Sequence, residues 1–397
     1  MFKIFVVGFC LIGISMGSWA TSLFDPLDGQ LDFSQYLSEN AYGFLPVPII
    51  ITDPAVGGGL GVVGLFFHED KDSQQERLKS MQKADADAGR YLLPPSVSAV
   101  AVAGTGNDSW FAGGGHMGFF KQGDIRYTAG GGYGDVNLDF YGFGDINLSK
   151  PIEIKTKASM VLQKLKFKLP NTRWFLGVSQ QYVSAEISPN SLGQLDEVLP
   201  PDWSEELRKI LTKRITTSSV GLIAEYDSRD NIFTPRQGYQ YQLESMWFDD
   251  SIGSDIDYSL TSFQGLNFWP LRKQIRLGLK VAADYADADS LLPPYATPSI
   301  QLRGIPAMRY QGQFVGMTEA EVVWEATNRW RAAVFAGAGK ATNDTGKFNQ
   351  ADTRKTYGVG FRYQIARRYG FDVGIDVARG PEETVWYITA GSAWAGI

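Results

Sequence analysis

Apolar and polar residues alternate along most of the chain, from about residue 44 to its end. The alternation is clear in ITTSSVGLIAEYD (215–227), GYQYQLESMW (238–247) and YGFDVGIDVAR (369–379). Successive side chains of a β strand point to opposite faces of the sheet. The period of two therefore predicts strands that each have one apolar and one polar face.

About sixteen segments fit this description, and many are close to the length that a strand needs to cross a membrane. They are 44–52, 58–67, 96–105, 109–120, 124–136, 155–168, 172–187, 215–227, 238–248, 256–268, 274–286, 316–326, 330–340, 354–365, 369–379 and 385–396. A soluble β sandwich also alternates, with its apolar face turned inward, but the strand lengths and the N-terminus favour a membrane protein. We expect an all-β fold, a transmembrane antiparallel β-barrel of about 16 strands.

The first residues, MFKIFVVGFCLIGISMGSWA, have one lysine, a short apolar run and small residues that end at Ala20. This is the pattern of an export signal, and the apolar run is short for a membrane anchor helix. We expect a signal peptide at 1–20, a short periplasmic N-terminal segment at 21–43 and a barrel at 44–397. Cleavage would leave a chain with no cysteine, because Cys10 is the single one, and this excludes disulfides and thiolate metal sites.

Composition and net charge further limit the class of protein to which the chain can belong. The 44 glycines, with 24 Phe, 18 Tyr and 10 Trp, suit tight turns and aromatic girdles. No apolar run after residue 20 is long enough for a spanning helix, so a membrane-resident chain needs a closed barrel. The formal net charge of −6 gives no basic footprint for a nucleic-acid partner. The expected location is the bacterial cell outer membrane, with outer-membrane lipid as a partner.

The segments between the strands alternate between short and long. If the N-terminus is periplasmic, the short turns are periplasmic, and 188–214, 287–315 and 341–353 are long extracellular loops. The charged segment 68–95, which contains EDKDSQQERLKSMQK, breaks the pattern because it falls on the periplasmic side. It is either a solvated loop or a docking segment for a possible periplasmic partner.

Two motifs go beyond the strand pattern. YDSRDNIFTPRQGY (226–239) is rich in turn formers, with Asp and Asn side chains that bond their own backbone, a proline that fixes φ and a glycine that permits unusual backbone. Its candidate residues are Asp227, Arg229, Asp230, Pro235 and Gly238. The second motif is LRGI (302–305), followed in order by EAEVVWE, FAGAG, YGVGFR and YGFDVGID. Together they resemble the Omp85 superfamily of BamA/TamA-type (bacterial surface antigen D15) barrels over about residues 44–397.

The resemblance implies a sixth extracellular loop that folds into the barrel lumen, where its arginine meets acidic residues on the inner wall. Strand parity puts Glu319, Glu321 and Glu325 on one face of their strand, and Asp372 and Asp376 on the polar face of theirs. An arginine fork matches carboxylates, and a glycine lets the loop backbone approach the wall. The expected loop latch is Arg303 with Gly304, Glu321, Asp372 and Asp376. The alternative is that Arg303 is an ordinary surface-loop residue.

The chain departs from the family pattern in three places. Gly337 stands where many relatives have an aspartate, so the acid that pairs with Arg303 is open. Only a short segment separates the signal from the first strand, so we expect no POTRA domains. The chain ends in Ile397 and not in the common terminal aromatic residue.

The sequence gives little support for an enzyme. Its two histidines are His68 and His116, and parity suggests that His116 faces the lumen. There is no G-x-S-x-G elbow and no zinc-ligand spacing, so we expect no catalytic site, metal or cofactor.

The expected function is translocation or insertion of proteins or lipids at the outer membrane, with an unfolded outer-membrane protein or a lipid as substrate. A passive pore or structural barrel is the alternative, and an outer-membrane hydrolase that uses His116 is a weaker one.

Overall fold

The structure, a computed structural model, describes residues 23–25, 27–35, 44–52, 56–68, 96–140, 152–189 and 214–394. The expected signal peptide at 1–20 and almost all of segment 68–95 lie outside these residues. No helix in the described part of the chain is long and apolar enough to cross a membrane.

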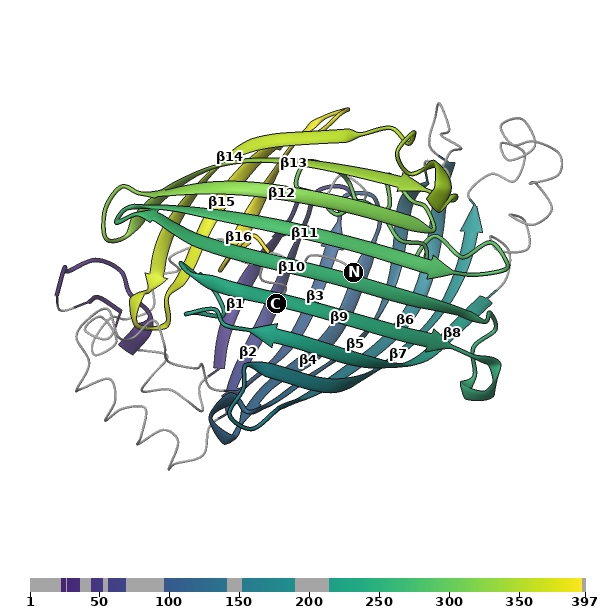
Figure 1. Cartoon of the computed structure of the whole chain (residues 1–397), viewed down its shortest axis with the longest axis horizontal. Helices are drawn as coiled ribbons and strands as arrows, with labels where there is room; N and C mark the ends of the chain where they lie inside the picture. Colours follow the sequence, from purple (N-terminus) through teal and green to yellow (C-terminus); the bar gives the residue numbers. More distant parts are fainter. Residues whose placement is uncertain are drawn as a thin grey trace.

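Sixteen antiparallel strands form one sheet in which each strand pairs with its neighbours in chain order, and the sheet curls into a barrel (Figure 1). The strands are β1 (Phe44–Ile51), β2 (Gly59–His68), β3 (Ser96–Thr105), β4 (Trp110–Phe120), β5 (Ile125–Phe140), β6 (Ile152–Lys168), β7 (Trp174–Pro189), β8 (Arg214–Asp227), β9 (Gly238–Phe248), β10 (Tyr258–Arg272), β11 (Ile275–Asp287), β12 (Phe314–Glu325), β13 (Trp330–Thr342), β14 (Arg354–Ala366), β15 (Phe371–Arg379) and β16 (Thr384–Ala390). Short 3-10 turns follow β4, β9, β13 and β14: η4 (Lys121–Gly123), η5 (Asp250–Ile252), η6 (Thr345–Lys347) and η7 (Arg367–Tyr369).

The barrel is nearly closed. β1 pairs with β2 and β16 pairs with β15, and the described residues show no pairing between β1 and β16, so the barrel has a seam between its first and last strands. The expected fold class is confirmed, and the expected strands are confirmed with small shifts at their ends. The last strand is a correction, because it was expected to reach 396 and β16 ends at Ala390. Gly391 follows with φ +74°, a left-handed conformation that ends the strand.

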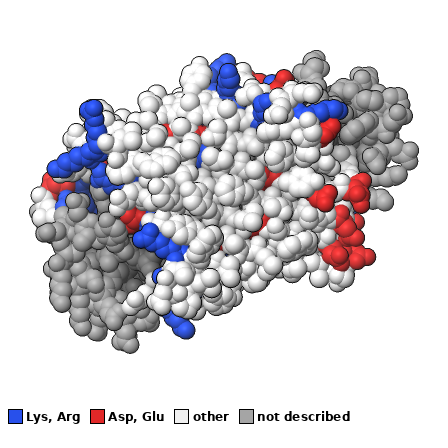
Figure 2. All heavy atoms as spheres, in the orientation of Figure 1, with Lys and Arg blue, Asp and Glu red and all other residues white. Residues whose placement is uncertain are grey.

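The faces of the strands are inverted relative to those of a soluble protein. On β8, Ser219 and Glu225 point inward and are 0% exposed, whereas Val220 and Leu222 point outward and are more than half exposed. The middle of the face seen in Figure 2 is mainly uncharged, and charged side chains gather toward its two ends. An apolar outer band over a polar interior is the arrangement that lipid requires of a barrel.

The two ends of the barrel differ. The turn end has the short turns after β4, β6, β10, β12 and β14 and the longer connection between β8 and β9, and the described N-terminal residues lie against it. There, Phe33 N donates to Ile365 O at 2.7 Å and Tyr363 Oη donates to Leu31 O at 2.8 Å. The opposite end, the loop end, has short connections after β3 and β15 and also the long connection 288–313 between β11 and β12.

Candidate functional site

The loop 288–313 packs against the inner wall of the barrel. Ile300, Leu302 and Ile305 are at most 6% exposed and form one apolar cluster with Val315 and Met317 of β12. The wall has room for them because β13 carries glycines at 337 and 339. A Cβ on Gly337 would lie 3.2 Å from Leu302 Cδ2, and one on Gly339 would lie 2.8 Å from Ile300 Cγ2. The departure from the family pattern at Gly337 thus coincides with a seat for the loop.

Arg303 lies at the centre of a buried carboxylate site, which we define as Glu319 and Glu321 of β12 and Asp376 of β15. Its Nη1 donates to Glu321 Oε2 at 2.8 Å and to Asp376 Oδ2 at 2.7 Å. Its Nε and Nη2 both donate to Glu319 Oε1, at 3.1 and 2.9 Å. The guanidinium also stacks on Phe335, 3.4 Å from the ring centroid. Arg303 is only 6% exposed, so it is not a surface-loop residue.

A second arginine shares these acids. Arg362 of β14 donates to both oxygens of Asp376, at 3.0 Å for the Nη2–Oδ2 bond, and lies 3.6 Å from Glu321. Charge-assisted bonds of this kind are the strong ones when they are buried and geometrically complete. The site is therefore a shared ionic network between one loop and three wall strands.

Asp372 requires a correction. It lies on the inner face of β15, but its partner is Arg331 of β13, whose Nη1 donates to Asp372 Oδ1. Asp372 and Asp376 are four positions apart on β15, about 13 Å along a strand. Arg303 therefore reaches Asp376 and not Asp372. Glu319, which parity placed on the same face as Glu321, is instead the acid that accepts two Arg303 donors.

Gly304 ties the loop to the hairpin that contains the last strand. It has φ +93°, its N–H donates to Tyr387 Oη of β16 at 2.9 Å, and a Cβ would lie 2.9 Å from Gly380 N. Only a glycine tolerates both the backbone conformation and the contact. Nearby, Arg309 lies 3.1 Å from Glu382, which also accepts a bond from the Tyr310 hydroxyl. The loop is thus bonded both to β16 itself and to the turn that precedes it.

The chain after β16 turns into the lumen and joins the same site. Gly391 N donates to Asp372 O at 2.7 Å, and Trp394 Nε1 donates to Glu319 Oε1 at 2.5 Å. The Trp394 ring packs 5.9 Å from Phe268, over the space that Gly278 leaves. Glu319 therefore accepts bonds from both the loop and the C-terminal residues. The feature of the sequence that could have indicated this contact is the position of Trp394, near the end of the chain but not at its last residue.

The turn motif organises the turn end of the barrel. Asp227 accepts bonds from Arg229 Nε at 2.9 Å and from Arg126 Nη1 of β5 at 2.9 Å. Asp230 Oδ1 accepts the N–H of residue 236 at 2.9 Å, and Pro235 O accepts Arg276 Nη1 at 3.0 Å. Gly238 begins β9 with φ +105°. The five motif residues thus shape one turn, and the carboxylate of Asp227 anchors it to the wall.

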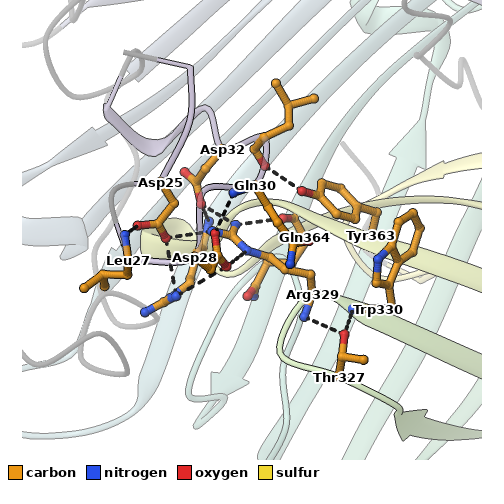
Figure 3. A network of polar contacts seen from close by, with 12 residues as sticks. Asp25, Leu27, Asp28, Gln30, Asp32, Thr327, Arg329, Trp330, Tyr363 and Gln364 are labelled. Atoms are coloured by element: carbon orange, nitrogen blue, oxygen red, sulfur yellow. Dashed lines mark hydrogen bonds and ion pairs between the residues drawn. The ribbon is translucent and has the colours of Figure 1, made fainter. Parts of the chain in front are cut away.

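A clasp at the turn end was missed by sequence reasoning. Arg329, between β12 and β13, is 0% exposed and binds Asp25 at 2.6 Å, Asp28 at 2.6 Å and Asp32 at 2.5 Å of the N-terminal segment (Figure 3). The hydrogen bond from Arg329 holds the pKa of the Asp28 carboxyl below its ordinary value. Burial alone would lower the pKa of Arg329, but its bonds to Asp28 and Asp32 raise it above the usual range. The repeated aspartates of DPLDGQLDF are the feature of the sequence that could have indicated this clasp.

His116 requires a second correction. His116 pairs with Ala129 of β5. Ala129 is on the same face of β5 as Tyr133, which points outward, so His116 lies on the outer wall and not in the lumen. Its Nδ1 bonds Ser98 Oγ at 2.9 Å, and Ser98 Oγ also bonds His68 Nε2 at 2.9 Å. In the part of the chain that the structure describes, no bond joins either histidine to a carboxylate that would orient it as in a hydrolase triad.

One group of acids has the spacing of metal ligands. Asp249, Asp250 and Asp257, all exposed at the loop end, place one carboxylate oxygen each within 4.8 Å of the others. Asp257 already accepts the N–H of residue 250 at 2.9 Å, and Asp249 accepts that of Ser251 at 2.9 Å. The hydrogen bonds within this turn account for its geometry without an ion.

The fold and the buried arginine define a class: a transmembrane β-barrel with a loop bound inside its wall. The family model described as the Omp85 superfamily domain matches residues 131–300 of the chain. The resemblance seen in the sequence is therefore confirmed. The match includes the turn motif and ends before LRGI.

Solved structures agree on the fold. BamA from Haemophilus ducreyi lacking POTRA domains 1-3 superposes with a TM-score of 0.53 at 12% identity, covering 88% of this chain and 70% of that one. CdiB from Escherichia coli gives 0.54 at 10%, covering 87% and 62%, and CdiB from Acinetobacter baumannii gives 0.52 at 10%, covering 88% and 59%. No curated protein matches the sequence. In the described residues before β1 there is a short bridged segment, Phe24 to Leu31, and no POTRA domain.

Proposed function

We propose that this barrel acts at the bacterial outer membrane in the translocation or insertion of proteins or lipids, and that loop 288–313 is a latched plug in its lumen. The observation that carries the proposal is Arg303, which is buried among three carboxylates from two wall strands. The turn end would face the periplasm and the loop end the exterior. The substrate would be an unfolded outer-membrane protein or a lipid.

The ion pairs of Arg303 are strong enough to hold the loop against the wall, and Arg362 makes release of the loop possible. Removing one partner of a buried ion pair costs about 3–5 kcal/mol, so withdrawal of Arg303 leaves an uncompensated site that strongly favours its return. Arg303 and Arg362 share Asp376 and Glu321, so Arg362 partly compensates the acids while the loop is out. Such a network supports two states of the loop, with the bound one dominant.

The latch is also connected to the seam. Loop residues bond Tyr387 of β16 and the turn before it, and Trp394 beyond β16 bonds Glu319 of the site. Movement of the loop therefore changes contacts of the strand that borders the seam with β1. We infer that plug release and seam opening are coupled.

A passive or structural barrel is the second candidate, and the same network favours it, because buried ion pairs also stabilise a closed wall. The two candidates differ in whether the loop moves. A disulfide between Leu302→Cys and Gly337→Cys, made in a Cys10→Ser background, would tie the loop to its seat, since a Cβ at 337 lies 3.2 Å from Leu302 Cδ2.

The test is single-channel recording of this variant in planar bilayers, before and after reduction. A gated plug predicts openings that are absent in the oxidised form and return with reductant. The matched control is Leu302→Cys alone, which has no partner thiol. Identical traces in oxidised and reduced forms, from barrels shown to be folded by heat-modifiable gel migration, would support the structural role instead.

A further inference from the structure

A row of polar side chains crosses the outer wall of the barrel, where lipid contact normally selects apolar residues. The row comprises one residue from each strand from β2 to β7: His68, Ser98, His116, Tyr127, Gln163 and Gln180. The register places Ser98 opposite His116 and Gln163 opposite Gln180. Their outward position follows from alternation, because Val100 on β3 and Val178 on β7 share these faces and are 61% and 51% exposed.

Hydrogen bonds join the row in two groups of three. Ser98 Oγ lies 2.9 Å from both His68 Nε2 and His116 Nδ1. Tyr127 Oη donates to Gln163 Oε1 at 2.8 Å, and Gln163 Nε2 donates to Gln180 Oε1 at 3.5 Å. The rings of His116 and Tyr127, 6.2 Å apart, connect the two groups.

The row continues on β7 and β8 to the loop end. Beyond Gln180, the next outward residue of β7 is Tyr182, which is 38% exposed. Then Thr216 Oγ1 bonds Ser184 Oγ at 3.3 Å, and Arg214 Nη2 bonds Glu186 at 3.1 Å. Polar side chains thus run from His68, the last residue of β2 at the turn end, to the first residue of β8 at the loop end.

Small residues flank the row on the same outer faces. On β4 these are Ala112, Gly114 and Gly118, and on β5 they are Ala129 and Gly131, as the pairing of the two strands shows. Short side chains let another molecule approach the backbone closely. The outer wall beside His116 is therefore polar and carries short side chains.

We propose that the outer wall of β2–β8 is a path for the polar head group of a membrane lipid, which crosses between leaflets while its acyl chains stay in the bilayer. Polar side chains that face the hydrocarbon of the membrane are costly in free energy. A continuous row that reaches both membrane–water interfaces is explained if these side chains bind a polar head group. The hydroxyls, imidazoles and amides offer hydrogen-bond donors and acceptors that match the phosphate, glycerol and amine of a phospholipid head group. A contact patch for a second barrel would not need to reach both ends of the strands.

The proposal names a lipid substrate and places it outside the lumen. It rests on the proposed function only in placing the barrel in a membrane, and it does not need the Arg303 latch. Failure of one is therefore distinguishable from failure of the other.

The test is a dithionite assay on proteoliposomes that contain a trace of NBD-labelled phosphatidylethanolamine. Protein-free vesicles lose about half of the fluorescence, from the outer leaflet, and a lipid path makes the remainder accessible. The triple variant His116→Leu, Gln163→Leu and Gln180→Leu keeps an apolar outer wall, so folding should be preserved. We expect it to slow lipid exchange about tenfold or more, because three hydrogen-bonding stations are lost.

Two controls keep the result specific. Val178→Leu, on the same outer face of β7, should exchange lipid at the wild-type rate. Encapsulated NBD-glucose reports any entry of dithionite through the lumen, and only lipid quenching beyond this signal counts. Wild-type vesicles no faster than protein-free ones, or a triple variant as fast as wild type, would overturn the path. Disulfide-linked dimers of Gln163→Cys in the Cys10→Ser background, with no lipid exchange, would instead assign the face to barrel–barrel contact.

Discussion

Replacing Arg303 with alanine is the perturbation that the lumen site predicts most sharply. It leaves Glu319, Glu321 and Asp376, which are 2%, 8% and 0% exposed, with Arg362 as the remaining arginine beside them. The cost of an uncompensated buried charge is about 3–5 kcal/mol, and each ~1.4 kcal/mol is a factor of ten. The ratio of molecules with the loop bound inside to molecules with the loop free should therefore fall by about two to four orders of magnitude.

The assay is the rate at which a membrane-impermeant maleimide labels a cysteine at position 302, in a Cys10→Ser background. Leu302 is 4% exposed, so labelling reports the fraction of time that the loop is out. We expect labelling in the Arg303→Ala protein to be faster by about a hundredfold or more. Gln301→Ala, an exposed neighbour in the same loop, should leave the rate unchanged.

A partial rescue would show that charge is the cause. Adding Glu321→Gln to Arg303→Ala removes one of the uncompensated acids, so labelling should slow again toward the wild-type rate. Equal labelling of wild type and Arg303→Ala would refute the reasoning, because the loop would then be held by its apolar contacts alone.

Three further predictions follow from the surroundings of the site. Trp394→Phe removes the bond to Glu319 and should lower the free energy of unfolding by about 1–3 kcal/mol, measured as a lower urea midpoint, whereas a midpoint equal to wild type would remove Trp394 from the network. The pKa of Asp28 is lowered in the folded protein, so its contribution to docking is complete above its ordinary value of 3.8 and declines as the pH falls below it. An acid-active protease should therefore cut the N-terminal segment faster as the pH is lowered below 3.8 than at pH 7, whereas Arg329→Ala should already be cut at pH 7, and resistance of that variant at pH 7 would contradict the clasp. Gly380→Ala would bring a Cβ into collision with the loop carbonyl and should accelerate maleimide labelling at position 302, and an unchanged rate would show that the turn yields without moving the loop.

The barrel was predictable from the sequence because alternation is a local property. Each strand shows one apolar and one polar face in its own residues, and the strand lengths together with the N-terminus favoured a membrane barrel over a soluble sandwich. Arg303 and Glu321 were also predictable, since parity put the acid on the inner wall and the family resemblance put the loop beside it.

What failed depended on position along the strands or on contacts between distant segments. Asp372 and Asp376 share a face, and parity could not tell which of them lies at the height of Arg303. His116 was assigned to the wrong face because large apolar side chains occupy both faces of its strand: Phe111, Met117 and Phe119 on one, and Trp110 and Phe120 on the face that His116 shares. The bond from Trp394 to Glu319 and the clasp at Arg329 join residues far apart in the sequence, with no local pattern that pairs them.

The measurement that tests the central claim most directly is single-channel conductance of the refolded barrel in a planar bilayer, wild type beside Arg303→Ala. The account predicts a small, fluctuating conductance for wild type and a large, steady one for the variant, with both proteins shown to be folded by heat-modifiable gel migration. Equal conductance in the two folded proteins would contradict the claim that Arg303 holds a plug in the lumen.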